Sequence, residues 1–256
     1  MEIKLPTKKV ESTRVNPKTM VIFGKPKTGK TTILSELDNC LIIDLEGGSD
    51  FVSALKYDVI KEADENGIEP VLVLKKLIDT IKAANKENGG FVYKYIAIDT
   101  VTALETIVLP LAGKLYQKTP MGRNWQGDDV RDLPQGAGYR YTRMALSIVI
   151  NDIQKLCDTL LIIGHLKDKL VEKDGKEMPE RGLDLTGKSA SILCSQVDAI
   201  GYIYREDNET IINFEPSESL IAGARSQHLK GQKITVATSD EENNVTVDWS
   251  KIFINN

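Results

Sequence analysis

The stretch VIFGKPKTGKTT, residues 21–32, decides the fold. It joins an apolar run to a loop of glycines and lysines and ends on two threonines. Residues 24–31 match G-x-x-x-x-G-K-[ST], a pattern whose glycines let the backbone curl until its N–H groups point at one phosphate. A helix that begins at the end of this loop adds its positive N-terminal dipole. The stretch therefore predicts a strand, a phosphate-binding loop and a helix.

Each part of this loop has a predicted contact with a nucleotide and its magnesium ion. Lys30 would bridge the outer phosphates, and the Thr31 hydroxyl would reach Mg²⁺. The alternative is a lysine-rich turn, but a chance match in a chain of this length has odds on the order of one in a hundred. The predicted nucleotide-binding residues are Gly24, Lys25, Pro26, Lys27, Thr28, Gly29, Lys30, Thr31 and Thr32.

An acid at the end of a second apolar run supplies the expected partner for the metal. Residues 94–99, KYIAID, predict a buried strand that ends in Asp99. A carboxylate at the carboxyl end of a parallel strand lies beside the loop that follows a neighbouring strand. We therefore expect Thr31 and Asp99 to form the Mg²⁺ site. A solvated acid at the end of a strand is the alternative interpretation.

Two other strand ends carry candidate catalytic groups. In LIIDLEGGSD, residues 41–50, Glu46 follows a strand and precedes two glycines, so it is the predicted residue that orients the attacking water. A helix-capping or solvent-facing acid is the alternative. His165 closes the strand TLLIIGH, residues 159–165, where it would sense the γ-phosphate. A single histidine at a strand end is otherwise usually structural.

Strands and helices alternate through the first two thirds of the chain, and short strand-like runs follow. The pattern predicts an α/β fold with a mostly parallel central sheet flanked by helices and antiparallel C-terminal strands. We expect an N-terminal arm over residues 1–18 and a single domain over 19–256. The predicted helices cover residues 29–37, 68–86, 101–116 with a bend near Pro110, and 137–156.

Composition limits the class of protein. The chain has 256 residues, 41% of them hydrophobic, and a net charge of -4, so nucleic acid would have to bind through a local patch. Its three cysteines are far apart and form no CxxC pair, which favours a reducing cytosol. The apolar runs are too short to span a bilayer. We therefore expect a cytoplasmic protein with no membrane partner.

The order of these motifs resembles that of the RecA-like P-loop ATPases. Over residues 18–206 the chain is most similar to the compact RecA-core proteins of bacteriophages, which are linked to ATP binding and to single-strand annealing or recombination. The resemblance implies ATP and Mg²⁺ as cofactors, Glu46 as the catalytic glutamate and Asp99 on the metal-binding strand. His165 stands where these proteins usually carry a glutamine that couples the nucleotide to a DNA-binding loop.

The resemblance also implies partners. RecA-like proteins self-associate into rings or filaments with ATP at the interface, and a basic motif near the C-terminus can reach a neighbour's nucleotide. Here GARSQH, residues 223–228, occupies the comparable place without the usual lysine–acid–arginine form, so Arg225 is the candidate finger. A surface arginine is the alternative. Phage replication or recombination proteins are further expected partners.

Two polar segments are candidate contacts for single-stranded DNA. In residues 113–143, cations that track phosphates alternate with rings that stack on bases. The alternative is a mobile insertion with rings that face the core. Residues 166–190 balance their charges and predict a flexible hairpin or a subunit contact. The residues expected to bind DNA are Lys118, Arg123, Trp125, Arg131, Tyr139 and Arg140.

Three functions remain in competition at this point. The first is an ATP-driven protein that binds single-stranded DNA in phage-type recombination or annealing. The second is a P-loop motor or loader that acts on a replication or packaging protein. The third, a small-molecule kinase, is disfavoured by Glu46, because a kinase avoids activating water. No base-reading motif is visible, so ATP and GTP are not distinguished.

Overall fold

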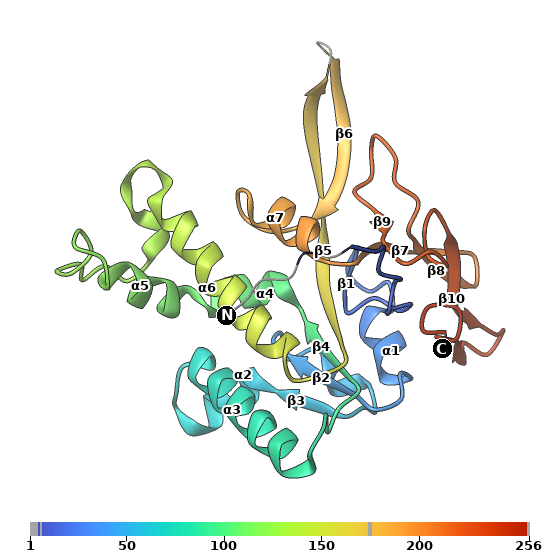
Figure 1. Ribbon diagram of the computed structural model, residues 1–256, viewed down its shortest axis with the longest axis horizontal. Coiled ribbons are helices and arrows are strands. Elements are labelled where there is room, and N and C mark those ends of the chain that lie inside the picture. Colours follow the sequence, from blue (N-terminus) through green and yellow to red (C-terminus); the bar gives the residue numbers. More distant parts are fainter. Residues whose placement is uncertain (1–4, 6, 174–175, 255–256) are drawn as a thin grey trace.

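The computed structural model describes residues 5, 7–173 and 176–254, and a single sheet runs through it (Figure 1). In sheet order the strands are β11 (Val245–Val247), β10 (Lys233–Ser239), β8 (Glu209–Asn213), β7 (Ala199–Glu206), β1 (Thr19–Gly24), β5 (Thr159–Lys173), β4 (Tyr95–Asp99), β2 (Cys40–Asp44) and β3 (Lys56–Asp58). The short β9 (Gly223–Ala224) pairs with β7, and β6 (Lys176–Leu183) pairs with β5. The strands from β7 to β3 are parallel, and β8, β10 and β11 continue the sheet in antiparallel fashion. The predicted fold class is therefore confirmed.

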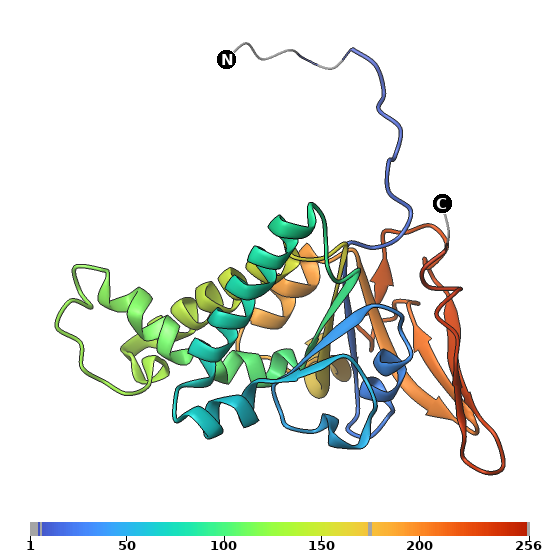
Figure 2. The ribbon, with the colours of Figure 1, turned by 90° about the horizontal axis from the view of Figure 1, so that it is seen from below.

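Helices cover both faces of the parallel part of the sheet. Their bounds are α1 (Lys30–Ser35), α2 (Val59–Asn66), α3 (Pro70–Asn88), α4 (Val101–Ile107), α5 (Leu109–Gln117), α6 (Ala137–Gln154) and α7 (Ser189–Gln196). Three single turns of 3-10 helix complete them, η1 (Ser49–Phe51), η2 (Val130–Asp132) and η3 (Pro134–Gly136). In Figure 2, α3, α6 and α7 lie on one side of the parallel strands, and α1 lies on the other side, next to the antiparallel strands that continue the sheet.

The alternation of side chains along each strand divides the core into two layers. In β1, Val21 and Phe23 pack with residues of α3, α4 and α6, whereas Met20 and Ile22 pack with α1 and the C-terminal segment. Burial on both faces explains why these strands read as continuous apolar runs rather than as alternating ones. The sheet is therefore the rigid frame that holds the loops at its carboxyl edge.

Several expected elements differ from those found. The helix expected over residues 68–86 is α3, but β3 and α2 before it were not predicted, because β3 has three residues and α2 buries only Val59 and Ala63, a single i, i+4 step. The bend expected near Pro110 is confirmed, since α4 ends at Ile107 and α5 begins at Leu109. The strand expected to stop at residue 165 instead continues to Lys173 and forms a hairpin with β6.

The described part of the N-terminal arm runs away from the body in Figure 2. Residues 5 and 7–15 are exposed and carry no helix or strand, and Arg14 and Asn16 join the arm to the body through hydrogen bonds to Asp158 and Ile254. Residues 1–4 and 6 of the expected arm lie outside the described residues. Within the described part of the chain, no helix is long and apolar enough to cross a membrane.

The C-terminal segment is fixed to the helix that follows the phosphate loop. The buried indole N–H of Trp249 donates a hydrogen bond of 2.8 Å to the backbone oxygen of Ile33 in α1. The Trp249 ring also stacks on Phe253, with 5.6 Å between ring centroids. This contact holds β10 and β11 beside α1, where they can form one wall of a site.

We predict that Trp249→Ala lowers the free energy of unfolding by about 3–5 kcal/mol, because it leaves a cavity and an unpaired carbonyl in the second core layer. Trp249→Phe should cost less, about 1 kcal/mol, since it removes mainly the hydrogen bond. Urea unfolding followed by circular dichroism measures both. The exposed neighbour Lys251 supplies the control, and Lys251→Ala should stay within about 0.5 kcal/mol of the parent. Equal stability of Trp249→Ala and the parent would contradict this account.

Candidate functional site

Parallel register brings four polar strand ends to the same edge of the sheet. Gly24 pairs with His165, and Asp44 pairs with Asp99. Asp99 in turn pairs with Ile163, two residues before His165. Because the carboxyl ends of parallel strands lie together, the loops after β1, β2, β4 and β5 meet at this edge.

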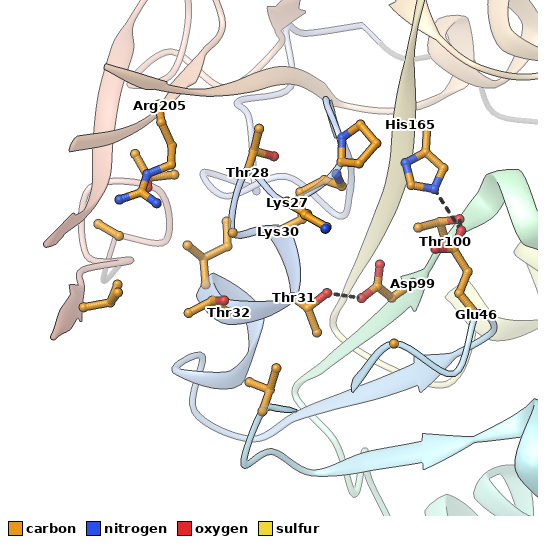
Figure 3. A pocket seen from close by; sticks show the side chains of 18 of the residues that line it. Lys27, Thr28, Lys30, Thr31, Thr32, Glu46, Asp99, Thr100, His165 and Arg205 are labelled. Carbon is orange, nitrogen blue, oxygen red and sulfur yellow. Dashed lines mark hydrogen bonds and ion pairs between the residues drawn. The ribbon is translucent and has the colours of Figure 1, made fainter. Parts of the chain in front are cut away.

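A pocket of about 530 Å³ opens at this edge, within the range of small-molecule sites (Figure 3). The phosphate loop lines it from Pro26 to Thr32, and Asp44, Glu46, Asp99, Thr100 and His165 line the side toward β2, β4 and β5. On the other side of the loop, β7 and the antiparallel strands beyond it contribute further lining residues, which are Arg205, Thr210, Ala237, Ser239 and Val245. The structure thus brings together the predicted loop, the predicted metal acid and the predicted catalytic glutamate.

The two glycines of the loop, Gly24 and Gly29, are required for different physical reasons. A methyl group on Gly24 would lie 2.4 Å from the backbone oxygen of Ile203 in β7, so this position is tight because neighbouring strands approach closely. Gly29 precedes α1 with φ 89°, a left-handed conformation that side chains other than glycine disfavour. The helix therefore starts at Lys30 with its first N–H groups at the pocket.

Lys30 is held inside the loop. Its side chain is buried, and Nζ donates to the backbone oxygen of Lys25 at 2.8 Å and of Gly24 at 3.4 Å. Burial lowers the pKa of Lys30, although the carboxylates of Asp99 and Glu46 oppose this shift. A buried cation beside a ring of N–H donors is suited to an anion that restores its lost solvation.

Thr31 and Asp99 meet across the sheet edge. The Thr31 hydroxyl donates to Oδ2 of Asp99 at 2.7 Å. Burial raises the pKa of Asp99, with the nearby Asp44 and Glu46 adding to the shift, while the hydrogen bond from Thr31 and the charge of Lys30 oppose it. Hard oxygen ligands of this kind fit Mg²⁺, which takes one or two protein oxygens and completes its shell with phosphates and water. The described residues hold no cluster of three or more His, Cys, Asp or Glu side chains placed for a metal.

Asp44 shapes the loop that carries Glu46. Its Oδ1 accepts from the backbone N–H groups of Glu46 and Gly47, and its Oδ2 accepts from that of Ser49, all within 2.8–2.9 Å. Burial alone would raise the pKa of Asp44, but the hydrogen bonds from Ser49, Glu46 and Gly47 outweigh it and lower the pKa. The carboxylate is therefore a structural anchor that presents Glu46 to the pocket.

Glu46 is oriented by residues from two other strands. Its Oε1 accepts from the Thr100 hydroxyl at 2.5 Å and lies 2.9 Å from Nε2 of His165. Thr100 also caps α4, since its hydroxyl accepts from the N–H of Ala103. Figure 3 shows Glu46, Thr100 and His165 grouped beside Asp99. This arrangement fixes Glu46 on the side of the pocket away from Arg205.

His165 lies where β5 leaves the sheet and enters the hairpin with β6. The backbone N–H of His165 donates to the Thr102 hydroxyl at 3.3 Å, and the backbone oxygen of His165 accepts from the backbone N–H of Asp184 at 2.9 Å. The Thr102 hydroxyl donates in turn to the Asp184 backbone oxygen. The residue beside Glu46 is thus connected to both ends of a hairpin that projects from the body in Figure 1.

The segment expected to contact DNA projects from the body with α5 and the start of α6 (Figure 1). Lys118, Arg123 and Arg140 are exposed there, and Tyr139 is 42% exposed. The other two expected DNA contacts, Arg131 and Trp125, contact residues of their own segment. The Arg131 side chain forms an ion pair with Asp129, and the Trp125 ring packs edge-on against Tyr116, with 5.8 Å between centroids.

Most of the aromatic side chains in this segment pack against one another, and a contact of Trp125 with DNA stays a prediction. The segment 113–143 holds four aromatic rings. Tyr116 contacts both Trp125 and Tyr141, so these three rings form an internal cluster, and Tyr139 is the fourth. Gly113 fits under the Trp125 ring, where an added methyl would lie 3.0 Å from it. The alternative considered from the sequence, rings that face the core, holds for these three.

Arg225 lies away from the pocket of its own chain. Its guanidinium donates to Asp198 and to the backbone oxygen of Ser195. Asp198 also accepts from the N–H groups of Lys18 and Thr19, at the amino end of β1. Arg225 is therefore at the edge of the sheet opposite to the phosphate loop, and a finger role remains a prediction about a neighbouring copy.

Three contributors to the site were missed in the sequence. Thr100 directly follows Asp99, and the pattern of a capping threonine before a helix was available to identify it. Asp44 was not predicted to have a role, although an aspartate at the start of a glycine-containing turn often accepts from the backbone N–H groups of that turn. Arg205 lies on β7, more than a hundred residues after both the phosphate loop and Asp99, and only the pairing of strands in the sheet brings it to the pocket.

The family comparison covers most of this site. A family model named AAA_24, described as an AAA domain, matches residues 16–226. Among solved structures, a KaiC-like protein, PH0186 from Pyrococcus horikoshii OT3, has 14% sequence identity and a TM-score of 0.43, with 90% of this chain and 89% of that chain covered. The RadB recombinase has 13% identity and a TM-score of 0.40, with 90% and 91% covered. No curated protein matches the chain.

We predict that Asp44→Asn destabilises the protein by about 2 kcal/mol at pH 7, because the amide loses charge-assisted bonds and turns N–H donors toward other donors. The folded pKa of Asp44 is lowered, so its contribution is complete above the unfolded pKa of about 3.9 and disappears as the pH falls through the folded pKa. Urea unfolding at neutral and acid pH tests the sign.

The matched control for this prediction is Asp58→Asn. Asp58 caps α2 by accepting from the N–H of Lys61, a place where asparagine serves about as well as aspartate. Its substitution should therefore leave stability nearly unchanged at either pH. A loss at Asp58 equal to that at Asp44, or a difference at Asp44 that grows toward acid pH, would contradict the anchor role.

Proposed function

The chain belongs to the AAA_24 family of AAA domains, and from this premise we propose that it binds ATP with Mg²⁺, hydrolyses it, and uses the cycle to bind single-stranded DNA. The observation that carries the proposal is the convergence of Lys30, the Thr31–Asp99 pair and Glu46 on one pocket. A phosphate loop with its cation, an oxygen site for a hard metal and a carboxylate for water are the parts that phosphoanhydride hydrolysis needs.

The chain's own groups divide the work. The loop N–H groups and Lys30 bind and orient the outer phosphates, and Thr31 with Asp99 would hold Mg²⁺, which when bound neutralises phosphate charge. Glu46 accepts a proton from the attacking water, because both of its contacts use Oε1 and the described residues offer no partner to Oε2. His165 and Thr100 keep its carboxylate in place.

We predict that Glu46→Gln binds ATP with nearly the parent affinity but hydrolyses it at least about a hundredfold more slowly, because the amide cannot take the proton. Lys30→Ala should lose ATP binding altogether. Calorimetry measures binding, and phosphate release measures turnover. Asp50, an exposed acid in the same loop, supplies the control, and Asp50→Asn should turn over normally. Unchanged hydrolysis in Glu46→Gln would remove Glu46 from the mechanism.

DNA binding is proposed for the α5–α6 projection. Lys118, Arg123 and Arg140 present exposed charge on a segment that stands clear of the body, and Tyr139 adds one exposed ring. Charges of this kind bind phosphates without reading sequence. In a phage-type recombination or annealing reaction, that is the contact needed to hold single strands of any sequence.

Self-association is proposed with the nucleotide at the interface. Phe51 is 99% exposed in η1, and the next residue, Val52, lines the pocket. A neighbouring copy that covered the Phe51 side chain would therefore approach the nucleotide. Arg225 of a neighbouring copy is the proposed finger, and ordering of the hairpin through His165 is the proposed route from nucleotide to neighbour.

A motor or loader that acts on a protein partner is the second candidate. The observation in its favour is the hairpin of β5 and β6, whose exposed Leu170 and balanced charges suit a protein surface better than a phosphate backbone. The two candidates differ in what stimulates hydrolysis. Single-stranded DNA alone stimulates the first, and a replication or packaging protein is required for the second.

We predict that Arg123→Ala combined with Arg140→Ala weakens binding to a fluorescent oligothymidine roughly tenfold at moderate salt, with a shallower salt dependence and unchanged ATP hydrolysis in the absence of DNA. Anisotropy and phosphate release measure the two effects. Lys61→Ala with Lys86→Ala removes two cations from α2 and α3 and should leave DNA affinity unchanged. Equal affinity of the Arg123/Arg140 variant and the parent would exclude this projection as the DNA site.

A further inference from the structure

The nucleotide pocket continues past the phosphates to a surface that no motif marks. Five residues line this end, one from the end of β7 and four from the antiparallel strands beyond it, and we call them the C-terminal wall: Arg205, Thr210, Ala237, Ser239 and Val245. The family model ends at residue 226, so β10 and β11 lie beyond the part of the chain that it matches. The wall therefore includes structure that the family assignment does not describe.

Strand register explains why these side chains share one face. Arg205 pairs with Thr210, and Thr210 pairs with Ala237. Ser239, two residues beyond Ala237, pairs with Val245. Further along the same face, Ile203 and Ile212 are buried against α1. The face that forms core near the middle of the sheet thus becomes polar where it reaches the pocket.

The position of the catalytic groups determines which part of a nucleotide reaches this wall. Figure 3 shows Glu46 and His165 on one side of the loop and Arg205 on the other, with Thr28 and Thr32 between them. A triphosphate whose terminal phosphate faces Glu46 must direct its sugar and base toward Arg205. This step rests on the proposed function.

The chemistry of the wall suits the face of a base better than its edge. The guanidinium of Arg205 is planar, donates to the Ser239 hydroxyl at 3.1 Å, and can stack on an aromatic ring. Ala237 and Val245 add apolar surface. The hydroxyls of Thr210 and Ser239 can rotate to donate or accept, so they suit the amino group of adenine as well as the oxygen of guanine.

We propose that the C-terminal wall binds the base of a purine nucleoside triphosphate, with Arg205 against the ring, and that it accepts adenine and guanine alike. A wall that read the base edge through Arg205 would favour guanine, whose O6 and N7 both accept from a guanidinium. If the hydroxyls of the wall adapt to the edge of either purine, the relative concentrations of the two nucleotides in the cell determine which one is bound.

Three probes separate the contributions of base and phosphate. These are the β,γ-imido analogues of ATP and GTP and inorganic tripolyphosphate, each titrated with Mg²⁺ by calorimetry. The parent protein should bind the two analogues with dissociation constants within about fivefold of each other. Arg205→Ala should weaken both by roughly three- to thirtyfold while changing the affinity for tripolyphosphate less than about twofold. Arg205→Lys, which keeps the charge without the plane, should resemble the alanine variant.

The controls distinguish failure of this inference from failure of the proposed function. Lys233 is an exposed cation on β10 that pairs with Glu215 outside the pocket, so Lys233→Ala should change none of the three affinities. An equal loss of tripolyphosphate in Arg205→Ala would assign Arg205 to the phosphates and overturn the inference. A preference above about thirtyfold for one purine, or no effect of Arg205→Ala, would overturn it as well. If Lys30→Ala left all three affinities intact, the nucleotide site itself would be wrong.

Discussion

The hydrogen bond from the Thr31 hydroxyl to the Asp99 carboxylate is the contact on which the site depends. It joins the first turn of α1 to the end of β4, and β5 lies between the strands that carry them. Only a parallel arrangement places both ends at one edge, and the two-layer core keeps the strands in register. The buried acid and the buried lysine beside it each lose solvation, which a metal-bound polyphosphate would restore.

A second set of contacts makes Glu46 more than an acid near a phosphate. Asp44 binds three N–H groups of the loop, and Thr100 and His165 hold the carboxylate from β4 and β5. Residues of three strands, β2, β4 and β5, or of the loops directly after them, therefore contribute to the orientation of one side chain. His165 and Thr102 also form hydrogen bonds with Asp184 at the base of the hairpin. A displacement of Glu46 that moves His165 would therefore also move the base of the hairpin.

The sequence was most informative where chemistry and local order coincide. The phosphate loop, Asp99 and Glu46 were identified because each follows a buried strand, and the parallel sheet then brings them together. The sequence was least informative where a role depends on how a polar loop folds on itself. The order of residues in 113–143 does not show that the Trp125 ring packs on Tyr116, or that Asp129 rather than a neighbouring acid pairs with Arg131. Short polar elements such as β3 and α2 were missed because three residues, or one i, i+4 step from Val59 to Ala63, are too few to show a period in the sequence.

The antiparallel extension shows how the sheet can add a function without a motif. Its strands continue the apolar face that α1 covers, and Trp249 holds them there through the backbone of Ile33. Where that face passes the end of α1, its side chains meet the pocket instead of the core. Any side chain at the positions of the C-terminal wall would line the nucleotide site. An arginine at position 205, rather than an aliphatic residue, therefore affects which ligand the site binds. The strands β1, β5, β4 and β2 position the phosphates, and the end of β7 with the antiparallel strands beside it can determine which group attached to the phosphates is bound.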